Sequence, residues 1–343
     1  MLVPLTLFQS RIMANRSAAQ LLLVSTSGRY QNGMKDLAIA GAVARRQSES
    51  LLKLRSERPE RILVLNCESS SLKYSFYDTE HPENAADGHV ENIGGSGSRI
   101  VQKGAKGELT RELPQGDHAG AFAAMLTALI DPTSGVIDDA SAITVVGHRV
   151  IHGGEKFTNA VVINDAVLKE IEALSPLAPL HNPLNVAGIL EARRVFPSVP
   201  HVAVFDTAFH ATLPRHAYLH GLPLDCYKTK GVRRYGSHGS SHSYVNLAVA
   251  QFLKRSPRDL KIVSCHLGNG VSLCAIDHGR SVDTTMGFTP GDGLIMGTRC
   301  GDIDSGIGAF LEGPEGLNAA QLDELVIQKC GPPGLSGIPS DMR

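Results

Sequence analysis

The chain lacks tryptophan, closely spaced cysteine pairs, long apolar runs and a marked net charge. A formal net charge of -1 over 343 residues gives no support for binding nucleic acid or another polyanion. No apolar run approaches the roughly 18 residues that a membrane helix needs, so we expect no membrane partner. The six cysteines form no CxxC pair, and four of them lie in or beside apolar or catalytic-looking segments, which favours reduced thiols and a reducing compartment. The remaining composition, 42% hydrophobic and 20% charged, is that of a globular protein with room for two domains.

The N-terminal region differs from the rest of the chain. Residues 1–48 carry six lysines and arginines against a single acid, Asp36, together with many Ser, Ala and Leu. This composition resembles an organelle transit peptide, and an upstream extension or a wrongly assigned start codon explains it equally well. Residues 49–61, ESLLKLRSERPER, have the composition of a charged linker. We therefore treat residues 1–60 as an N-terminal extension outside the folded domains.

Strand-like and helix-like segments mix through the remaining chain, which predicts an α/β fold. The expected strands are 62–65, 72–77, 143–150, 202–205, 262–267 and 271–276. The expected helices are 120–130, 184–196 and 241–254. Asn182 and Pro183 are expected to begin the second helix and Pro197 to end it. The serines of HGSSH, residues 238–242, can cap the third helix.

Two segments about 200 residues apart share one pattern, which we interpret as a weak internal repeat. ILVLNCESSSLKYSFYD spans residues 62–78, and IVSCHLGNGVSLCAID spans residues 262–277. Each segment has an apolar strand, a turn of small polar residues, a second strand and a terminal Asp. The pattern predicts two related domains, each beginning with a β-hairpin aimed at a shared cleft.

Several motifs place a cation or an acid at a strand end or a turn, where it could bind an anion or take part in catalysis. In VVGHRVIHGGE, a strand delivers Arg149, whose fork suits a carboxylate or phosphate, although a surface ion pair is the ordinary alternative. Asp206 follows a buried strand, where α/β enzymes place catalytic groups, and a turn cap is its alternative. His238 and His242 lack the Glu of a zinc HExxH motif, so contact with an anion suits His238 better. His181 lies at a proline-rich turn, where a structural role is common.

Glycine-rich segments add to this pattern. Gly268 and Gly270 in CHLGNGVS predict a turn whose backbone N–H groups converge on a phosphate, although an ordinary β-turn has the same sequence. In GDGLIMGTRCGDIDSG, Arg299 lies between acidic residues, of which Asp302 and Asp304 could bind a metal or be solvated. Cations, glycine turns and one strand-end acid together suit a reaction between two anions, where catalysis is mostly positioning and neutralisation of charge.

The order and wording of these motifs resemble the acetate kinase (acetokinase) family from about Ile62 to Arg343. The resemblance rests on SSSLK, GHRVIHGGEKF, PLAPLHNP, VFDTAFH and CHLGNG…MGTRCGD. It implies an α/β fold of duplicated ribonuclease-H-like domains, shared with sugar kinases, heat-shock ATPases and actin. The domains expected from it are 61–206 and 207–343, the second incomplete because the family continues for several dozen residues.

The resemblance also implies roles for individual residues. Asp206 would be the acid/base group, and His238 and Arg299 would stabilise charge on the transferring phosphoryl group. Arg149 would bind the substrate carboxylate, with His181 in support. Because a carboxylate nucleophile is already ionised at pH 7, we expect Asp206 to act mainly by organising metal, water and phosphate contacts.

Cofactor and substrate contacts follow from the same resemblance. Asn66 would help to hold Mg²⁺, and ATP would be the co-substrate that phosphorylates acetate to acetyl phosphate. The residues implied in ATP binding are Lys73, His266, Leu267, Gly268, Asn269, Gly270, Asp341, Met342 and Arg343. The residues implied in the acyl pocket are Ile151, Leu180, Ser237 and Pro290. A homodimer and a cytoplasmic location are implied by the family, with a mitochondrion or plastid as the alternative location through residues 1–60.

Two departures from the family pattern keep alternatives open. Glu68 stands where the family usually has Gly, and it adds a negative charge beside the expected phosphates. Ser237 replaces a usual Phe, which predicts a wider and less apolar acyl pocket. The alternatives to an acetate kinase are therefore a propionate or butyrate kinase and, given the expected loss of the C-terminal segment, a catalytically impaired fragment or pseudoenzyme.

Overall fold

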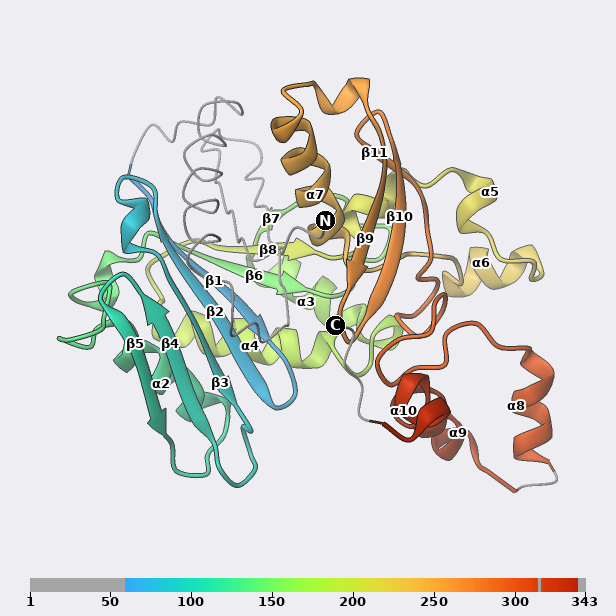
Figure 1. The fold of residues 1–343 in the computed structure, drawn as a ribbon, viewed down its shortest axis with the longest axis horizontal. Coiled ribbons are helices and arrows are strands. Elements are labelled where there is room, and N and C mark those ends of the chain that lie inside the picture. Colours follow the sequence, from blue (N-terminus) through green and yellow to red (C-terminus); the bar gives the residue numbers. More distant parts are fainter. Residues whose placement is uncertain (1–58, 314–315, 339–343) are drawn as a thin grey trace. The chain divides into compact units, whose positions relative to one another are not determined.

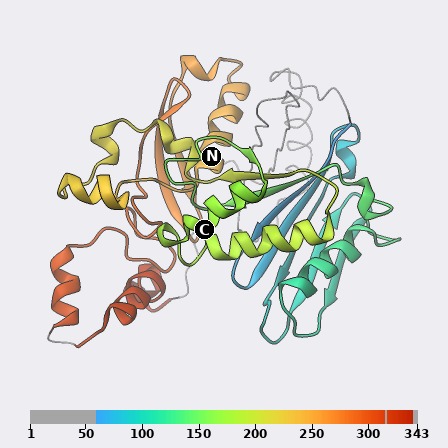
Figure 2. The same cartoon turned by 180° about the vertical axis from the view of Figure 1, so that it is seen from behind.

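The computed structural model describes residues 59–313 and 316–338. These residues fall into two compact units with their boundary between Ala208 and Phe209, called here the N-terminal unit and the C-terminal unit. Figures 1 and 2 show the chain from opposite sides. Residues 1–58 of the expected extension, and with them the expected targeting signal, lie outside the described residues. Within the described ranges, no helix is long and apolar enough to cross a membrane.

The N-terminal unit contains an eight-stranded mixed sheet with the order β5-β4-β3-β2-β1-β6-β8-β7 (Figure 1). The strands are β1 (Arg61–Cys67), β2 (Ser71–Asp78), β3 (Ala86–Glu91), β4 (Arg99–Gly104), β5 (Gly107–Glu112), β6 (Val145–Val150), β7 (Val161–Val162) and β8 (His201–Phe205). Strands β1 to β5 form an antiparallel meander. Strand β6 pairs in parallel with both β1 and β8, so three neighbouring strands run in one direction.

Three helices accompany this sheet: α2 (His118–Leu129), α3 (Asp165–Ala173) and α4 (Asn182–Val195). Helix α2 begins where the side chain of Asp117 accepts a hydrogen bond from the backbone of Gly120, which satisfies one of the free N–H groups of the first turn. Pro183 lies in the first turn of α4, where its missing N–H costs nothing. Helices α2 and α4 contact each other, and Figure 2 shows both on the same side of the sheet.

Strand β1 is buried on both faces, which explains its uninterrupted apolar run. Leu63 and Leu65 belong to the core that includes Phe122 of α2. Ile62 and Val64 alternate with them and belong to a second cluster on the opposite face. A strand anchored on both faces gives a fixed position to the turn that follows it.

The C-terminal unit contains a three-stranded antiparallel sheet with the order β11-β10-β9. Its strands are β9 (Lys261–Leu267), β10 (Val271–Asp277) and β11 (Arg280–Thr284). Its helices are α5 (Arg215–Tyr218), α6 (Leu224–Lys230), α7 (Gly239–Phe252), α8 (Ser305–Glu312), α9 (Ala319–Gln328) and α10 (Gly331–Ser336). Helix α7 packs against β9 (Figure 1).

The two hairpins predicted from the repeat are present, one in each unit. Residues 68–70 separate β1 from β2, and residues 268–270 separate β9 from β10. A third antiparallel strand, β3 or β11, extends each hairpin. The hairpins differ at the other side of the first strand: β1 pairs with β6, whereas β9 is an edge strand of the described sheet, and its Val263 and Leu267 are exposed.

All six expected strands and all three expected helices are present, with ends within two residues of the prediction. The expected serine cap of α7 is wrong. The residue that precedes the helix is His238, which has φ 59° and makes no side-chain cap, because Ser240 and Ser241 already lie inside the first turn. All six cysteines are free, as the reduced-thiol prediction requires.

Candidate active site

The N-terminal unit gathers charged side chains at one edge of its sheet. Strands β1, β6 and β8 are parallel neighbours, so their carboxyl ends meet at the same edge, where α/β proteins commonly bind ligands. Asn66 lies at the end of β1, Arg149 lies in β6, and Asp206 follows β8 directly. With Glu68 and Lys73, these residues form what we call the Arg149 cluster.

Arg149 and Asp206 form a buried, bidentate ion pair. The Nε of Arg149 donates to both carboxylate oxygens of Asp206 at 3.2 and 3.2 Å, and Nη2 donates to Oδ2 at 2.6 Å. The side chains are 16% and 2% exposed. Burial would lower the pKa of Arg149, but the charge and hydrogen bonds of Asp206 outweigh it and the pKa is raised. The pair therefore fixes the guanidinium in its charged form.

The guanidinium of Arg149 has N–H donors that its hydrogen bonds to Asp206 and Asn66 do not use. Its Nη1 donates to Oδ1 of Asn66 at 3.2 Å, in addition to the bonds to Asp206. An arginine has five N–H groups, and these contacts use Nε–H, one hydrogen on Nη1 and one on Nη2. One further hydrogen on each terminal nitrogen is left for an incoming carboxylate or phosphate.

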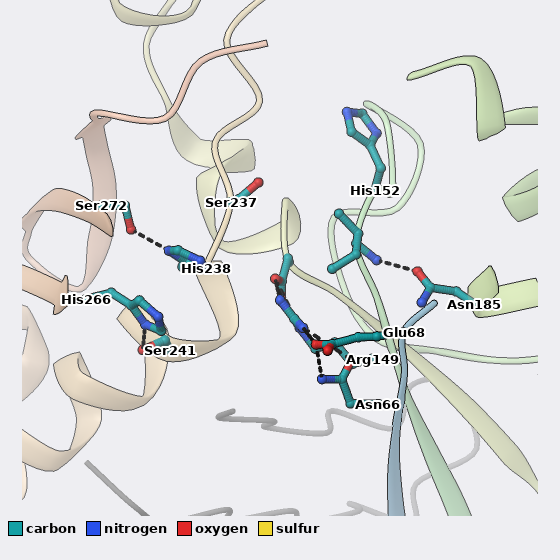
Figure 3. Close-up of polar contacts among 12 residues, drawn as sticks. Asn66, Glu68, Arg149, His152, Asn185, Ser237, His238, Ser241, His266 and Ser272 are labelled. Carbon is teal, nitrogen blue, oxygen red and sulfur yellow. Dashed lines mark hydrogen bonds and ion pairs between the residues drawn. The ribbon is translucent and has the colours of Figure 1, made fainter. Parts of the chain in front are cut away.

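Glu68 lies among the same cations. Its carboxylate accepts hydrogen bonds from Lys73 Nζ at 3.1 and 3.3 Å, from Asn66 Nδ2 at 3.1 Å and from Ser71 Oγ at 3.1 Å. It also lies 3.8 Å from Nη1 of Arg149, and Figure 3 shows Glu68 and Asn66 beside that guanidinium. Burial alone would raise the pKa of Glu68, but the charges of Lys73 and Arg149 outweigh it and the pKa is lowered. Glu68 is therefore a carboxylate, and its φ is not in the left-handed region, so the residue fits the turn without backbone strain.

Two buried asparagines of α4 hold the loop that follows β6. The backbone N–H of Ile151 donates to Asn185 Oδ1 at 3.0 Å (Figure 3), and that of His152 donates to Asn182 Oδ1 at 3.1 Å. Asn185 Nδ2 also donates to the carbonyl of Cys67 at 3.1 Å, so one side chain links the ends of β1 and β6. Burial lowers the pKa of His152 to about 4. Sequence reasoning used Asn182 only as a helix start and did not name Asn185, although polar residues on the buried side of HNPLN were the available signal for their contacts with the loop.

The expected acyl-pocket residues belong to different units. Ile151 and Leu180 lie in the N-terminal unit, and Ser237 and Pro290 lie in the C-terminal unit. Leu180 is exposed, and Ser237 is buried. His181 immediately precedes α4, where its side chain makes no cap. The shared pocket stays a prediction.

The C-terminal unit contains a network of alternating histidines and serines at the start of α7. Ser272 Oγ lies 2.8 Å from His238 Nδ1 and 2.9 Å from His242 Nε2, and His242 Nδ1 lies 2.9 Å from Ser264 Oγ. Burial lowers the pKa of His242 to about 2, so this ring is neutral. A hydroxyl has one proton and two lone pairs, so Ser272 donates to at most one of the two rings. A protonated His238 requires that Ser272 accept from its Nδ1.

The glycine turn after β9 packs against His238. The rings of His238 and His266 stack with centroids 3.9 Å apart, and Nδ1 of His266 lies 2.9 Å from Ser241 Oγ (Figure 3). A Cβ added to Gly270 would lie 3.1 Å from Cε1 of His238, so the ring's close approach favours glycine there. Neither Gly268 nor Gly270 has a positive φ. The N–H of Gly268 donates to the carbonyl of Gly270 at 3.1 Å, so this expected phosphate donor is used within the turn.

Arg299 lies in the second glycine-rich segment of the C-terminal unit. Its Nη1 donates to the carbonyl of Pro290 at 2.9 Å, and burial lowers its pKa. Asp302 accepts from the N–H of Gly293 at 2.6 Å, and Asp304 begins α8 by accepting from Gly306 at 2.8 Å. Both acids therefore have structural partners.

Other expected site residues divide as follows. Arg149 and Asp206 belong to the N-terminal unit, and His238 and Arg299 belong to the C-terminal unit. That both sets serve one reaction remains a prediction. The expected nucleotide contacts Asp341, Met342 and Arg343 lie outside the described residues. The expected contact Leu267 ends β9, and Asn269 follows Gly268 in the turn, where its carbonyl accepts from the N–H of Gly297 at 2.9 Å.

A large mixed sheet, with cations at the carboxyl ends of its parallel strands, defines a protein with the acetate and sugar kinase-like fold. The Acetokinase family model matches residues 61–343, and the chain belongs to that family. This confirms the resemblance inferred from the motifs and the expected fold class.

The relatives are similar over most of the chain. An acetate kinase of Clostridium botulinum, strain Langeland, is 49% identical over 283 residues, which cover 82% of this chain and 71% of the relative. The crystal structure of Porphyromonas gingivalis acetate kinase matches with a TM-score of 0.76 and 42% identity, over 82% of this chain and 71% of that one. A propionate kinase from Francisella tularensis matches with a TM-score of 0.76 and 36% identity, over 81% and 70%.

Proposed function

We propose that this protein is an acetate kinase, which transfers the γ-phosphoryl group of ATP reversibly to acetate and gives acetyl phosphate and ADP. The observation that carries the proposal is the fixed, charged guanidinium of Arg149. It is fixed by Asp206 at the edge where three parallel strands end, and it keeps two N–H groups for an anion. Family membership supports the same reaction.

The acceptor acid needs a binding group more than a base. Acetate is ionised at neutral pH, so its oxygen is already a nucleophile. Arg149 binds and orients this carboxylate through its remaining donors, because a guanidinium fork matches the geometry of two oxygens. Asp206 acts as the positioning residue that fixes the guanidinium.

The nucleotide phosphates need positive charge and N–H donors. Lys73, His238 and Arg299 provide the positive groups, and the segment from His266 to Gly270 provides backbone contacts. Charge on the transferring phosphoryl group is stabilised when such groups are held in place before the reaction. Ser272 Oγ, 2.8 Å from Nδ1 of His238, can accept a hydrogen bond from a protonated ring and so hold it in place.

Mg²⁺ fits the oxygen ligands of the Arg149 cluster. It prefers hard oxygen ligands, and in kinases it is held by one or two protein oxygens, substrate phosphates and water. Asn66 Oδ1 and the Asp206 carboxylate would supply such oxygens, and no group of three or more His, Cys, Asp or Glu in the described residues forms a full metal cage. When bound, the ion neutralises phosphate charge.

Trapping of acyl phosphate with hydroxylamine tests the proposal directly. Full-length protein is incubated with MgATP and acetate, propionate or butyrate. We expect product with acetate, and we expect Arg149→Lys to raise the KM for acetate at least about tenfold, because a point charge cannot make the bidentate contact. Arg193→Lys, at an exposed ion pair, is the control and should change nothing. Folded protein that gives no product with any acid would be a pseudoenzyme or impaired fragment.

Propionate is the second candidate substrate. Ser237 is buried and smaller than the Phe expected from the family pattern, and one structural match is a propionate kinase. The three-acid assay ranks the substrates by kcat/KM. A higher value for propionate than for acetate would reassign the activity within the same class.

We also expect a homodimer in the cytoplasm. Light scattering coupled to gel filtration measures the mass in solution, and a mass near 36.5 kDa would contradict the dimer. Fluorescent fusions with and without residues 1–60 test the location. A difference between their distributions would favour the organelle alternative.

A further inference from the structure

We propose that Glu68 is a built-in competing anion, which occupies the cations of the Arg149 cluster until a phosphate or carboxylate displaces it. The inference deepens the proposed function and rests on it for the identity of the displacing anion. The carboxylate takes hydrogen bonds from Lys73 and Asn66 and faces Arg149. An incoming anion must therefore replace these contacts before it gains its own.

Two carboxylates lie against Arg149, and their geometry separates their roles. Asp206 is 2% exposed and bidentate, with a closest contact of 2.6 Å. The Glu68 side chain is 40% exposed, and its oxygen lies 3.8 Å from Arg149. Asp206 is thus a fixed partner of the guanidinium, whereas Glu68 can move into solvent.

Backbone contacts close the turn in addition to the bonds that the Glu68 carboxylate accepts from Asn66 and Ser71. The backbone N–H of Glu68 donates to the carbonyl of Ser71 at 2.9 Å, and the ring of His118 donates to the carbonyl of Glu68 at 2.9 Å. The carbonyl of Ser70 accepts from Ile93 at 3.0 Å. These contacts use only the backbone of residue 68, so the side chain can leave or be replaced while the turn keeps its shape.

The charges of the cluster explain the expected effect. Lys73 and Arg149 are two cations, and Asp206 and Glu68 are two carboxylates, so the cluster is neutral while Glu68 is present. Removal of the Glu68 charge leaves one net positive charge for an incoming anion.

Metal-free binding of inorganic pyrophosphate tests the inference without catalysis. Isothermal titration in EDTA compares full-length wild-type protein with Glu68→Gln, which keeps the shape of the side chain and removes its charge. We expect pyrophosphate to bind about three- to tenfold more tightly to the variant, since the contacts are partly exposed and partly screened. Glu68→Gly, which also removes the hydrogen-bond acceptor, should increase the affinity for pyrophosphate at least as much.

Two controls locate the effect. Glu172→Gln removes a charge from an exposed position of α3 and should leave the affinity unchanged. In a Lys73→Met background, the gain from Glu68→Gln should shrink, because the shared cation is gone. Circular dichroism and thermal unfolding confirm that each variant is folded.

The outcomes separate this inference from the proposed function. Equal or weaker pyrophosphate binding by folded Glu68→Gln overturns the inference, and so does a failure of both proteins to bind pyrophosphate. Tighter binding without acyl phosphate production by any variant supports the inference and contradicts the proposed function. Where the kinase reaction is observed, Glu68→Gln should also lower the KM for ATP.

Discussion

The buried ion pair of Arg149 and Asp206 leads to a prediction for the Asp206→Asn variant. The substitution keeps the shape of the side chain and removes its charge. Arg149 then stays buried with a neutral partner, since the backbone of β6 fixes its position. We expect a large loss of stability and, under the proposed function, a higher KM for acetate, because Asp206 orients the guanidinium.

The magnitude follows from burial and contacts. Breaking a buried ion pair by removing one charge commonly costs about 3–5 kcal/mol. Two features reduce the loss here: asparagine keeps one oxygen for the Nε–H, and Glu68, 3.8 Å away, can approach Arg149. We therefore expect the free energy of unfolding to fall by about 2–3 kcal/mol.

Urea unfolding followed by far-UV circular dichroism measures this loss. Hydrogen exchange of β6 and β8 amides assigns it to the N-terminal unit, because unfolding of two units need not be a single transition. Asp165→Asn is the matched control: Asp165 is 84% exposed in its pair with Arg193, so its loss should stay below about 1 kcal/mol. Equal losses in the two variants would refute the reasoning.

Three further predictions concern the C-terminal unit. The pKa of His242 is about 2 in the folded state and 6.5 ordinarily, so only the unfolded state gains a proton at this residue as the pH falls below 6.5. His242 should therefore lower the free energy of unfolding by about 2 kcal/mol between neutral pH and pH 5, measured by urea titration. His242→Gln should lack this part of the pH dependence. Ser272→Ala removes the acceptor of His238 and should lower kcat about tenfold with little change in the KM for acetate, measured by hydroxylamine trapping; an unchanged kcat would exclude a positioning role. The pKa of Asp292, about 6, is raised by burial and by Asp302, so Asp302→Asn should move it toward 3.8 in a carbon-13 titration.

The sequence predicted those parts of the fold that local patterns determine. The apolar run of β1 and the proline at the start of α4 gave correct elements because one segment carries the whole signal. Five strands were missed: β3, β4, β5, β7 and β11. The clearest case is β5, which has no buried residue and is held by its pairing with β4 rather than by an apolar face. Such strands depend on a partner that a local pattern does not contain.

In the candidate site, too, the sequence indicated individual residues but not the contacts that depend on distant segments. Arg149 and Asp206 were singled out as strand-end residues, and the parallel pairing of β6 with β8 brings them together. Glu68 was noted as an added charge, but its contacts with Lys73 and Asn66 depend on the register of the hairpin, which pairs Asn66 with Lys73. The role of Asn185 required knowledge that α4 crosses the ends of β1 and β6.

The two hairpins give an internal comparison for the role of Glu68. In each, the first residue after the strand donates its N–H to a carbonyl two or three residues ahead, Glu68 to Ser71 and Gly268 to Gly270. In the second turn the corresponding residue, Gly268, has no side chain, and a histidine ring lies 3.1 Å from the place where a Cβ on Gly270 would stand. The first turn instead fills the space beside its cations with a carboxylate. Since the backbone closes both turns, the side chain at this position controls access of anions to the turn rather than its shape.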